Sequence, residues 1–208
     1  KGAGAVSTNT AVGASALAGS GADNTAVGYQ AMYSNTTGIS NTAIGKYAGY
    51  SNTTGQDNFF GGLLAGYGNT TGFGIVAVGK QAMSNNTTGN ANIGIGYQAL
   101  ALNTTASNNT AVGYQAAYSN QTGVGLVAIG QGALYSNTAS DNTAVGQGAL
   151  YANTTGTKNI AYGGGTNGVA GGALGSNTTG SNNTAIGSSA LWNNTTASNN
   201  TAVGYQSA

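Results

Sequence analysis

The sequence predicts an all-β fold, a parallel β-solenoid of about twelve coils that are each about 17 residues long. The phrase Asn-Thr-Ala-Val-Gly and its variants recur along the whole chain of 208 residues, and the step between copies is most often the same. Glycine accounts for 38 residues, and no segment keeps the 3.6-residue apolar spacing of an amphipathic helix. A short, regular period is typical of solenoids, whose coils contact only their neighbours.

The repeat is numbered here from its first asparagine. Places 1 to 17 follow the order Asn-Thr-Ala-Val-Gly-Tyr-Gln-Ala-Leu-Tyr-Ser-Asn-Thr-Thr-Gly-Ser-Asn. Because the pattern continues from end to end, the sequence predicts a single repeat domain over residues 1–208. The place-5 glycines, one for each coil, are Gly13, Gly28, Gly45, Gly62, Gly79, Gly96, Gly113, Gly130, Gly146, Gly163, Gly187 and Gly204.

Two short apolar patches in each coil predict two strands of about four or five residues. The first patch covers places 2 to 4, and the second covers places 8 and 9, where Ala and then Leu or Met recur. Side chains alternate along a strand, so places 2 and 4 share one face. We predict that this face points into the coil and that the place-3 alanines pack against a second surface. The predicted core residues at place 4 are Val12, Val27, Ile44, Val78, Ile95, Val112, Ile129, Val145, Ile186 and Val203.

Asparagine recurs at place 12, usually within an Asn-Thr-Thr motif. Asparagine tolerates left-handed backbone and hydrogen-bonds locally, which favours turns. In stacked coils such side chains form ladders in which each amide donates to the next coil. The sequence therefore predicts a ladder at this corner of the coil, with the place-1 asparagines at the other corner. The triplets also match the N-glycosylation pattern, although the turn explains them without modification. The predicted ladder residues are Asn35, Asn52, Asn69, Asn86, Asn103, Asn120, Asn137, Asn153, Asn177 and Asn194.

One interval between place-5 glycines is longer than the others. The step from Gly163 to Gly187 exceeds a regular coil by seven places. Aligning Gly172–Leu174 with the Gly-Ala-Leu of other coils assigns the extra residues to 164–170. The sequence predicts a looped-out insertion or a break in the ladder here, and a binding loop is the alternative.

Aromatic residues gather at two places of the repeat. Exposed aromatic rows stack on sugar rings or contact proteins, and the alternative is that they pack along the rod or between chains. Place 6 carries Tyr29, Tyr97, Tyr114 and Tyr205. The candidate surface contacts at place 10 are Tyr33, Tyr50, Tyr67, Tyr118, Tyr135, Tyr151 and Trp192.

The composition excludes several function classes. The net charge of +1, with four scattered lysines, argues against a nucleic-acid partner. There is no histidine or cysteine, and the three aspartates each precede a place-1 asparagine, which is typical of a turn. We therefore expect no enzymatic activity, no cofactor and no metal site. Apolar runs of only a few residues predict no membrane insertion.

The repeated "NTAVGYQAL…NTTGSNNTAVGYQAL" pattern resembles the head repeats of trimeric autotransporter adhesins and, more closely, repeats of bacteriophage tail fibres. The resemblance covers essentially the whole chain, although the family repeat is often shorter, which implies a longer corner loop here. It implies a left-handed parallel β-roll in a compact homotrimer, at a cell surface or on a virion. It further implies a non-enzymatic extracellular fibre or adhesin segment, used for display or attachment. A cell-surface glycan or a protein receptor would then be a partner.

Two other functions remain open from the sequence. The chain begins at place 10 and stops at place 9, so one molecule's end could supply the half-turn that the next lacks. That complementarity predicts a filament subunit stacking head to tail. Ice binding is the third hypothesis, since flat threonine arrays on solenoids order water. The two neighbouring threonines of the turn diverge, which weakens this hypothesis.

Overall fold

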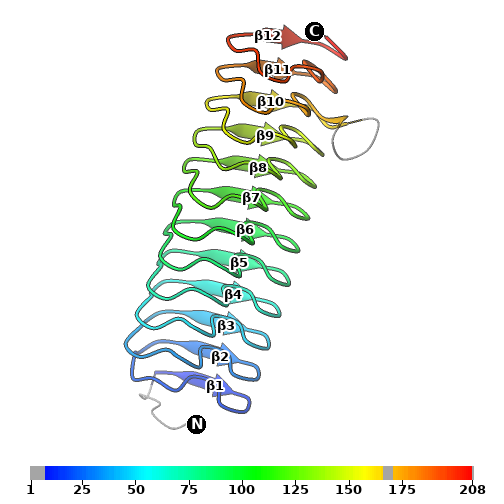
Figure 1. Ribbon diagram of the computed structural model, residues 1–208. Coiled ribbons are helices and arrows are strands. Elements are labelled where there is room, and N and C mark those ends of the chain that lie inside the picture. Colours follow the sequence, from blue (N-terminus) through cyan, green and yellow to red (C-terminus); the bar gives the residue numbers. More distant parts are fainter. Residues whose placement is uncertain (1–7, 166–170, 208) are drawn as a thin grey trace. The chain divides into compact units, whose positions relative to one another are not determined.

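The computed structural model describes residues 8–165 and 171–207 and confirms the predicted all-β class (Figure 1). Each coil contributes one strand, at places 2 to 4, and the described residues contain no α-helix. The strands are β1 Thr10–Val12, β2 Thr25–Val27, β3 Thr42–Ile44, β4 Phe59–Gly61, β5 Val76–Val78, β6 Ile93–Ile95, β7 Thr110–Val112, β8 Val127–Ile129, β9 Thr143–Val145, β10 Ile160–Tyr162, β11 Thr184–Ile186 and β12 Thr201–Val203.

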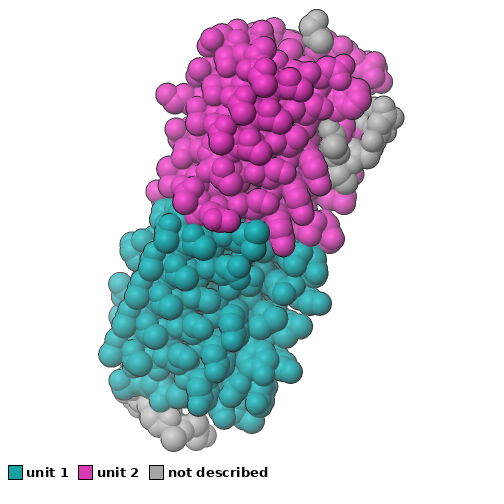
Figure 2. Space-filling view, in the orientation of Figure 1, with its two compact units in different colours: residues 1–107 teal, residues 108–208 magenta. Residues whose placement is uncertain are grey.

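The chain divides into two compact units, residues 1–107 and residues 108–208 (Figure 2). In the first unit β1 to β6 lie in chain order, and each neighbouring pair is parallel. The second unit repeats this arrangement with β7 to β12. Each unit is therefore a parallel β-solenoid with the predicted coil length, and the single domain over residues 1–208 stays a prediction.

Residues at the same place of successive coils pair with one another, whatever the length of the coil. Thr10 pairs with Thr25 across the shortest coil, and Ile160 pairs with Thr184 across the longest. The strands hold this register because a slip of one residue would move every inward side chain to the outside. Differences in coil length are therefore taken up in the turns.

The long coil shows where its extra residues begin. The amide of Gly165 donates to the carbonyl of Gln147 at 3.0 Å, as a regular place-7 residue does. The amide of Ala173 then donates to Gly163 at 2.9 Å, in the way that a place-8 residue bonds to place 5 in other coils. The insertion predicted at 164–170 therefore starts after Gly165, and residues 166–170 lie outside the described part of the chain.

The prediction of which strand residues face the core was wrong. The place-3 alanines point inward, as Ala26 at 0% exposure shows, whereas the place-4 residues point outward, as Val12 at 57% shows. Alternation fixes only that the two rows face opposite sides, and the width of the coil decides which row is inside. Leu or Met at place 9 fills this narrow interior, so alanine is the side chain that fits opposite. The residues wrongly assigned to the core are Val12, Val27, Ile44, Val78, Ile95, Val112, Ile129, Val145, Ile186 and Val203, all exposed or half-buried.

The second predicted strand is also absent, because places 6 to 10 form a turn. Place 9 adopts left-handed backbone, with φ of 51° at Met32 and 53° at Leu134. Hydrogen bonds between coils nevertheless continue here, for example from the amide of Met32 to the carbonyl of Ala48 at 2.9 Å. The apolar patch at places 8 and 9 therefore marks buried residues and does not mark a strand.

One exceptional coil shows how tightly the interior packs. Phe60 replaces the usual alanine at place 3 and is completely buried. The neighbouring place-9 residues are Gly49 and Gly66 instead of Leu or Met, and a Cβ on either would lie within 2.6 Å of the Phe60 ring. A single phenylalanine thus fills the space of two aliphatic side chains, which keeps the core volume constant.

Candidate functional site

The place-12 asparagines form hydrogen-bonded ladders as predicted, but each amide donates to the preceding coil and not to the next. In residues 1–107, the Nδ2 of Asn69 donates to the Oδ1 of Asn52 at 2.8 Å, and Asn86 donates to Asn69 at 2.9 Å. In residues 108–208, Asn177 donates to Asn153 at 2.8 Å. Each Nδ2 group also donates within its own turn, as Asn69 does to the carbonyl of Gly72 at 3.0 Å.

The place-12 ladder runs through the interior and not along the surface. Its members from Asn35 to Asn177 are at most 2% exposed. Their amide nitrogens are committed to internal hydrogen bonds, so these Asn-X-Thr triplets present no free acceptor for N-glycosylation in the folded chain.

The place-1 asparagines build a second internal ladder. Asn24 donates from Nδ2 to the carbonyl of Gly38 at 2.8 Å, and its Oδ1 accepts the backbone amide of Asn41 at 3.0 Å. Place 1 is Ile75 in one coil and Leu126 in another, and each of these amides still bonds to the preceding asparagine. Within residues 8–165 and 171–207, no buried side-chain nitrogen or oxygen lacks a partner. The polar side chains in the narrow core are therefore fully hydrogen-bonded.

The outward side of the strands is a regular surface in each unit. We call it the strand face and define it by places 2 and 4 of the twelve strands. It carries Thr, Val, Ile, Phe and Tyr with no charged residue. Ile44 on this face is 46% exposed and Ile129 is 40% exposed. The ring of Phe59 lies over Gly61, with its Cε1 3.1 Å from where a Cβ would stand, so a large side chain covers the position of a missing one.

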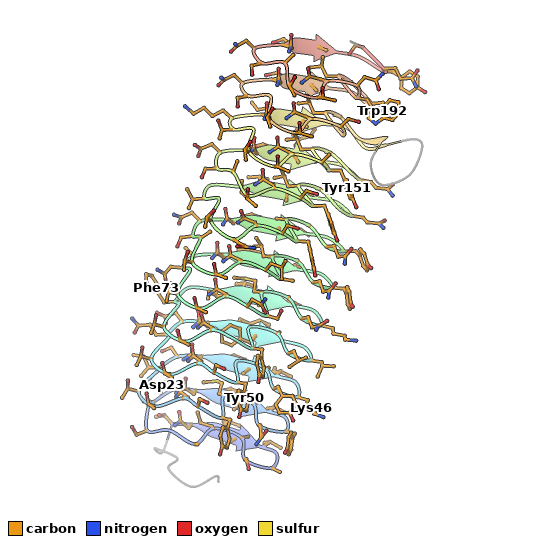
Figure 3. All side chains as sticks on the ribbon, viewed as in Figure 1. Asp23, Lys46, Tyr50, Phe73, Tyr151 and Trp192 are labelled. Carbon is orange, nitrogen blue, oxygen red and sulfur yellow. The ribbon has the colours of Figure 1, made fainter. Side chains whose placement is uncertain are left out.

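The place-10 tyrosines form two stacks. In the first unit the rings of Tyr33 and Tyr50 are 5.4 Å apart at 11°, and Tyr50 and Tyr67 are 5.1 Å apart at 11°. In the second unit Tyr118, Tyr135 and Tyr151 stack at 5.2 and 5.0 Å, both at 7°. The predicted packing along the rod is thus present within each unit. Trp192, the last candidate of this row, is 40% exposed (Figure 3).

The stacks limit what the tyrosines can bind. Tyr50 and Tyr135 have a neighbouring ring on both faces, so only their edges meet solvent. A sugar stacks on a ring face, so the middle members of the stacks have no free face for one.

Beside the first stack lies a cluster that the sequence did not indicate. Tyr47, at place 7, meets Tyr29 and Tyr50 edge to face, with centroids 5.4 and 5.7 Å apart. The Nζ of Lys46 lies 5.1 Å from the Tyr47 ring centroid and 5.7 Å from that of Tyr29 (Figure 3). Lys46 therefore makes cation–π contacts, and the signal available in the sequence was a tyrosine outside its usual places.

Stacking changes the ionisation of the central rings. Burial by the neighbouring rings, followed by the charge that Tyr67 and Tyr33 would carry, raises the pKa of Tyr50 above the usual 10.0. Burial, followed by the charge that Tyr151 and Tyr118 would carry, likewise raises the pKa of Tyr135.

We expect an alkaline loss of stability from these shifts. Above pH 10 the unfolded chain releases the Tyr50 proton before the folded chain does, so the unfolding midpoint Tm falls as pH rises. Below pH 10 this contribution is constant. Absorbance at 295 nm should show tyrosines that ionise later than free tyrosine, and Tyr50→Phe should reduce both effects. A titration in which every tyrosine ionises together near pH 10 would contradict this prediction.

The three aspartates lie where the sequence suggested, in the turn. Asp23, Asp57 and Asp141 occupy place 17 with left-handed φ of 57 to 61°, and all three are exposed. Figure 3 shows Asp23 and Phe73 on the same edge of their unit. Within the described residues, no three acidic, histidine or cysteine side chains gather as a metal site would require. In that part of the chain, no helix has the length and apolar character to span a bilayer.

Comparisons with protein-family models, curated proteins and solved structures found no match for this chain.

Proposed function

We propose that this protein is a non-enzymatic segment of an extracellular fibre or adhesin, and that copies of it associate through the strand face. The carrying observation is that this face has no charged residue and at least one apolar side chain on each of the twelve strands, and that many of these apolar side chains are open to water. Contiguous exposed apolar surface beyond several hundred Å² is typical of interaction sites. The resemblance to adhesin and tail-fibre repeats points to a left-handed roll, a homotrimer and a cell or virion surface.

A second copy of the chain suits the strand face for a geometric reason. Both copies have the same spacing between coils, about 4.8 Å, so their rows of side chains can match along the length of a unit. The cover of Gly61 by Phe59 keeps the face continuous, which favours contact with another surface. Closed cyclic symmetry would bury the face on every subunit.

Hydrogen bonds between coils would make such a fibre segment stiff. Backbone bonds run from strand to strand and also through the turns, as from Ser34 to Tyr50 at 2.9 Å. The asparagine ladders add a line of internal bonds in each unit. Rigidity in this design comes from repeated short bonds and does not require a wide apolar core.

Ile129→Lys tests the association. We expect light scattering of the unaltered protein to give about 60 kDa, three times the chain mass of 20.1 kDa, and the variant to give the monomer mass. The physical reason is that an interface of this kind would bury an unpaired charge.

Val124→Lys is the matched control. Val124 is 41% exposed, as Ile129 is at 40%, but it lies at place 16 in the turn and not on the strand face. This variant should keep the mass of the unaltered protein. Association would be disproved by a monomeric unaltered protein, and another interface would be indicated if Ile129→Lys kept its mass. Particles far larger than a trimer would favour the head-to-tail filament.

The strand face gives ice binding less support than protein contact. Threonine occupies place 2 in seven of the twelve strands, and Phe59, Val76 and Ile93 interrupt its row in three successive strands. An ordered water layer requires an uninterrupted array of similar groups, whereas a protein interface accommodates mixed side chains.

A further inference from the structure

A shallow hollow of about 480 Å³, widely open to solvent and called the cavity below, lies beside the first tyrosine of the first stack. Its wall consists of residues 18–20 from one coil and residues 33–36 from the next. Among the residues that the structure describes, those that line it carry no charge.

The cavity exists because one coil differs from its neighbours. At place 10 this coil has Ala18, where the next three coils have tyrosine, so no ring covers Tyr33 from that side. The step from Gly13 to Gly28 is also shorter by two than the regular step between place-5 glycines. The other face of Tyr33 is covered by Tyr50, at 5.4 Å. Tyr33, which is 40% exposed, therefore presents one ring face to the cavity.

Two hydroxyl groups of the wall are left to act as acceptors toward a ligand. The Oγ of Ser20 donates to the carbonyl of Thr36 at 3.1 Å, and the Oγ1 of Thr36 donates to the carbonyl of Thr53 at 2.9 Å. Their hydroxyl protons are thus used inside the protein, and their oxygens can still accept a hydrogen bond. These two groups suit a ligand with hydroxyl donors, and the described residues of the wall offer an anion no cation.

We propose that this cavity binds a neutral sugar, with one hexose ring stacked on the free face of Tyr33 and its hydroxyls donating to Ser20 and Thr36. A pyranose has an apolar C–H face for the ring and hydroxyls around its edge, which matches both walls. The middle tyrosines of the stacks cannot bind in this way because both of their faces are covered. This ligand is an addition to the proposed fibre role, and it does not depend on self-association because place 10 is not part of the strand face.

Saturation-transfer difference NMR tests the site with maltose, cellobiose and lactose as neutral probes and N-acetylneuraminic acid as the anionic probe. We expect transfer to the ring C–H protons of at least one neutral disaccharide and none to the anionic sugar. Tyr33→Ala should weaken binding about tenfold, since it removes the stacking surface. Tyr135→Ala is the matched control, because it removes a tyrosine whose faces are both occupied, and it should leave binding unchanged.

Ala18→Tyr is the variant that tests the cavity most directly. It extends the stack by one ring with the residue that other coils carry at this place, so it should preserve or raise Tm while closing the cavity. Binding should then be lost in a well-folded protein. The proposal is overturned if no neutral disaccharide binds, or if Ala18→Tyr or Tyr33→Ala binds as well as the unaltered protein does. Measuring the mass of each variant separates this result from a failure of the association proposal.

Discussion

Gly79→Ala is expected to lower the free energy of unfolding by about 3 kcal/mol or more, and so to melt its coil first. Gly79 has a φ of +125°, a region that side chains other than glycine rarely adopt. A Cβ at this position would also stand 2.6 Å from the carbonyl oxygen of Gly96 in the next coil. That oxygen belongs to the backbone and cannot move without breaking the stacking of the two coils. The measurement is Tm by circular dichroism at fixed protein concentration.

Gly74→Ala is the matched control, a few positions earlier in the same unit. Its φ is +65°, and the nearest atom to a Cβ would be 3.9 Å away. Ala91 occupies the same place one coil later with a φ of 51°, so alanine is compatible with this backbone. We expect a loss of about 1 kcal/mol, the usual cost of left-handed backbone. Equal losses in the two variants would show that close approach between coils does not explain the place-5 glycines.

Asn69→Leu is expected to destabilise the protein by about 3 kcal/mol, although leucine has a similar shape and is more apolar. The change removes the donor to Asn52 and the acceptor for Asn86, two bonds of 2.8 and 2.9 Å in the interior. The Oδ1 of Asn52 would then lie buried without its partner, and the Nδ2 of Asn86 would keep only its bond within the turn. Leaving one partner of a buried hydrogen bond unsatisfied costs more than the bond itself contributes. Urea unfolding measures the difference.

Asn85→Ala is the control for Asn69→Leu. Asn85 is the same residue type in the next coil, but it is exposed and its side chain only accepts a long 3.4 Å bond from Ser84. We expect a change within about 0.5 kcal/mol. If Asn69→Leu proved as stable as Asn85→Ala, the internal ladder would be dispensable, and apolar packing alone would hold the coils together.

These two experiments address how a coil with so little apolar volume remains folded. Alanine fills place 3 almost throughout, and the largest recurrent core side chains are Leu and Met at place 9. Such a core contains few large apolar side chains. The asparagine ladders and the close contacts at the place-5 glycines hold neighbouring coils in register, because each coil contacts the next at the same places of the repeat.

The repeat period by itself determined most of the architecture. Equal spacing of the same phrase requires equal conformations, and equal conformations stack with the same residues paired, as Val12 with Val27. The asparagine ladder followed from the same reasoning, since one polar turn residue per coil must meet its copy. The tyrosine row was predicted too, and packing of its rings along the rod was one of the two alternatives that the sequence left open.

What only the tertiary structure decided was the direction of each side chain and the path of each turn. The repeat period cannot show which residues face the core. In Thr-Ala-Val, side-chain alternation is satisfied equally well with Ala inside or with Thr and Val inside. The width of the closed coil settles that choice, and it placed Ala26 inside and Val27 outside. The left-handed backbone at Met32 likewise depends on closing the coil over its own core, so an apolar pair that read as a strand became a turn. Local sequence fixes which residues repeat, whereas the volume enclosed by the whole coil fixes which of them water can reach.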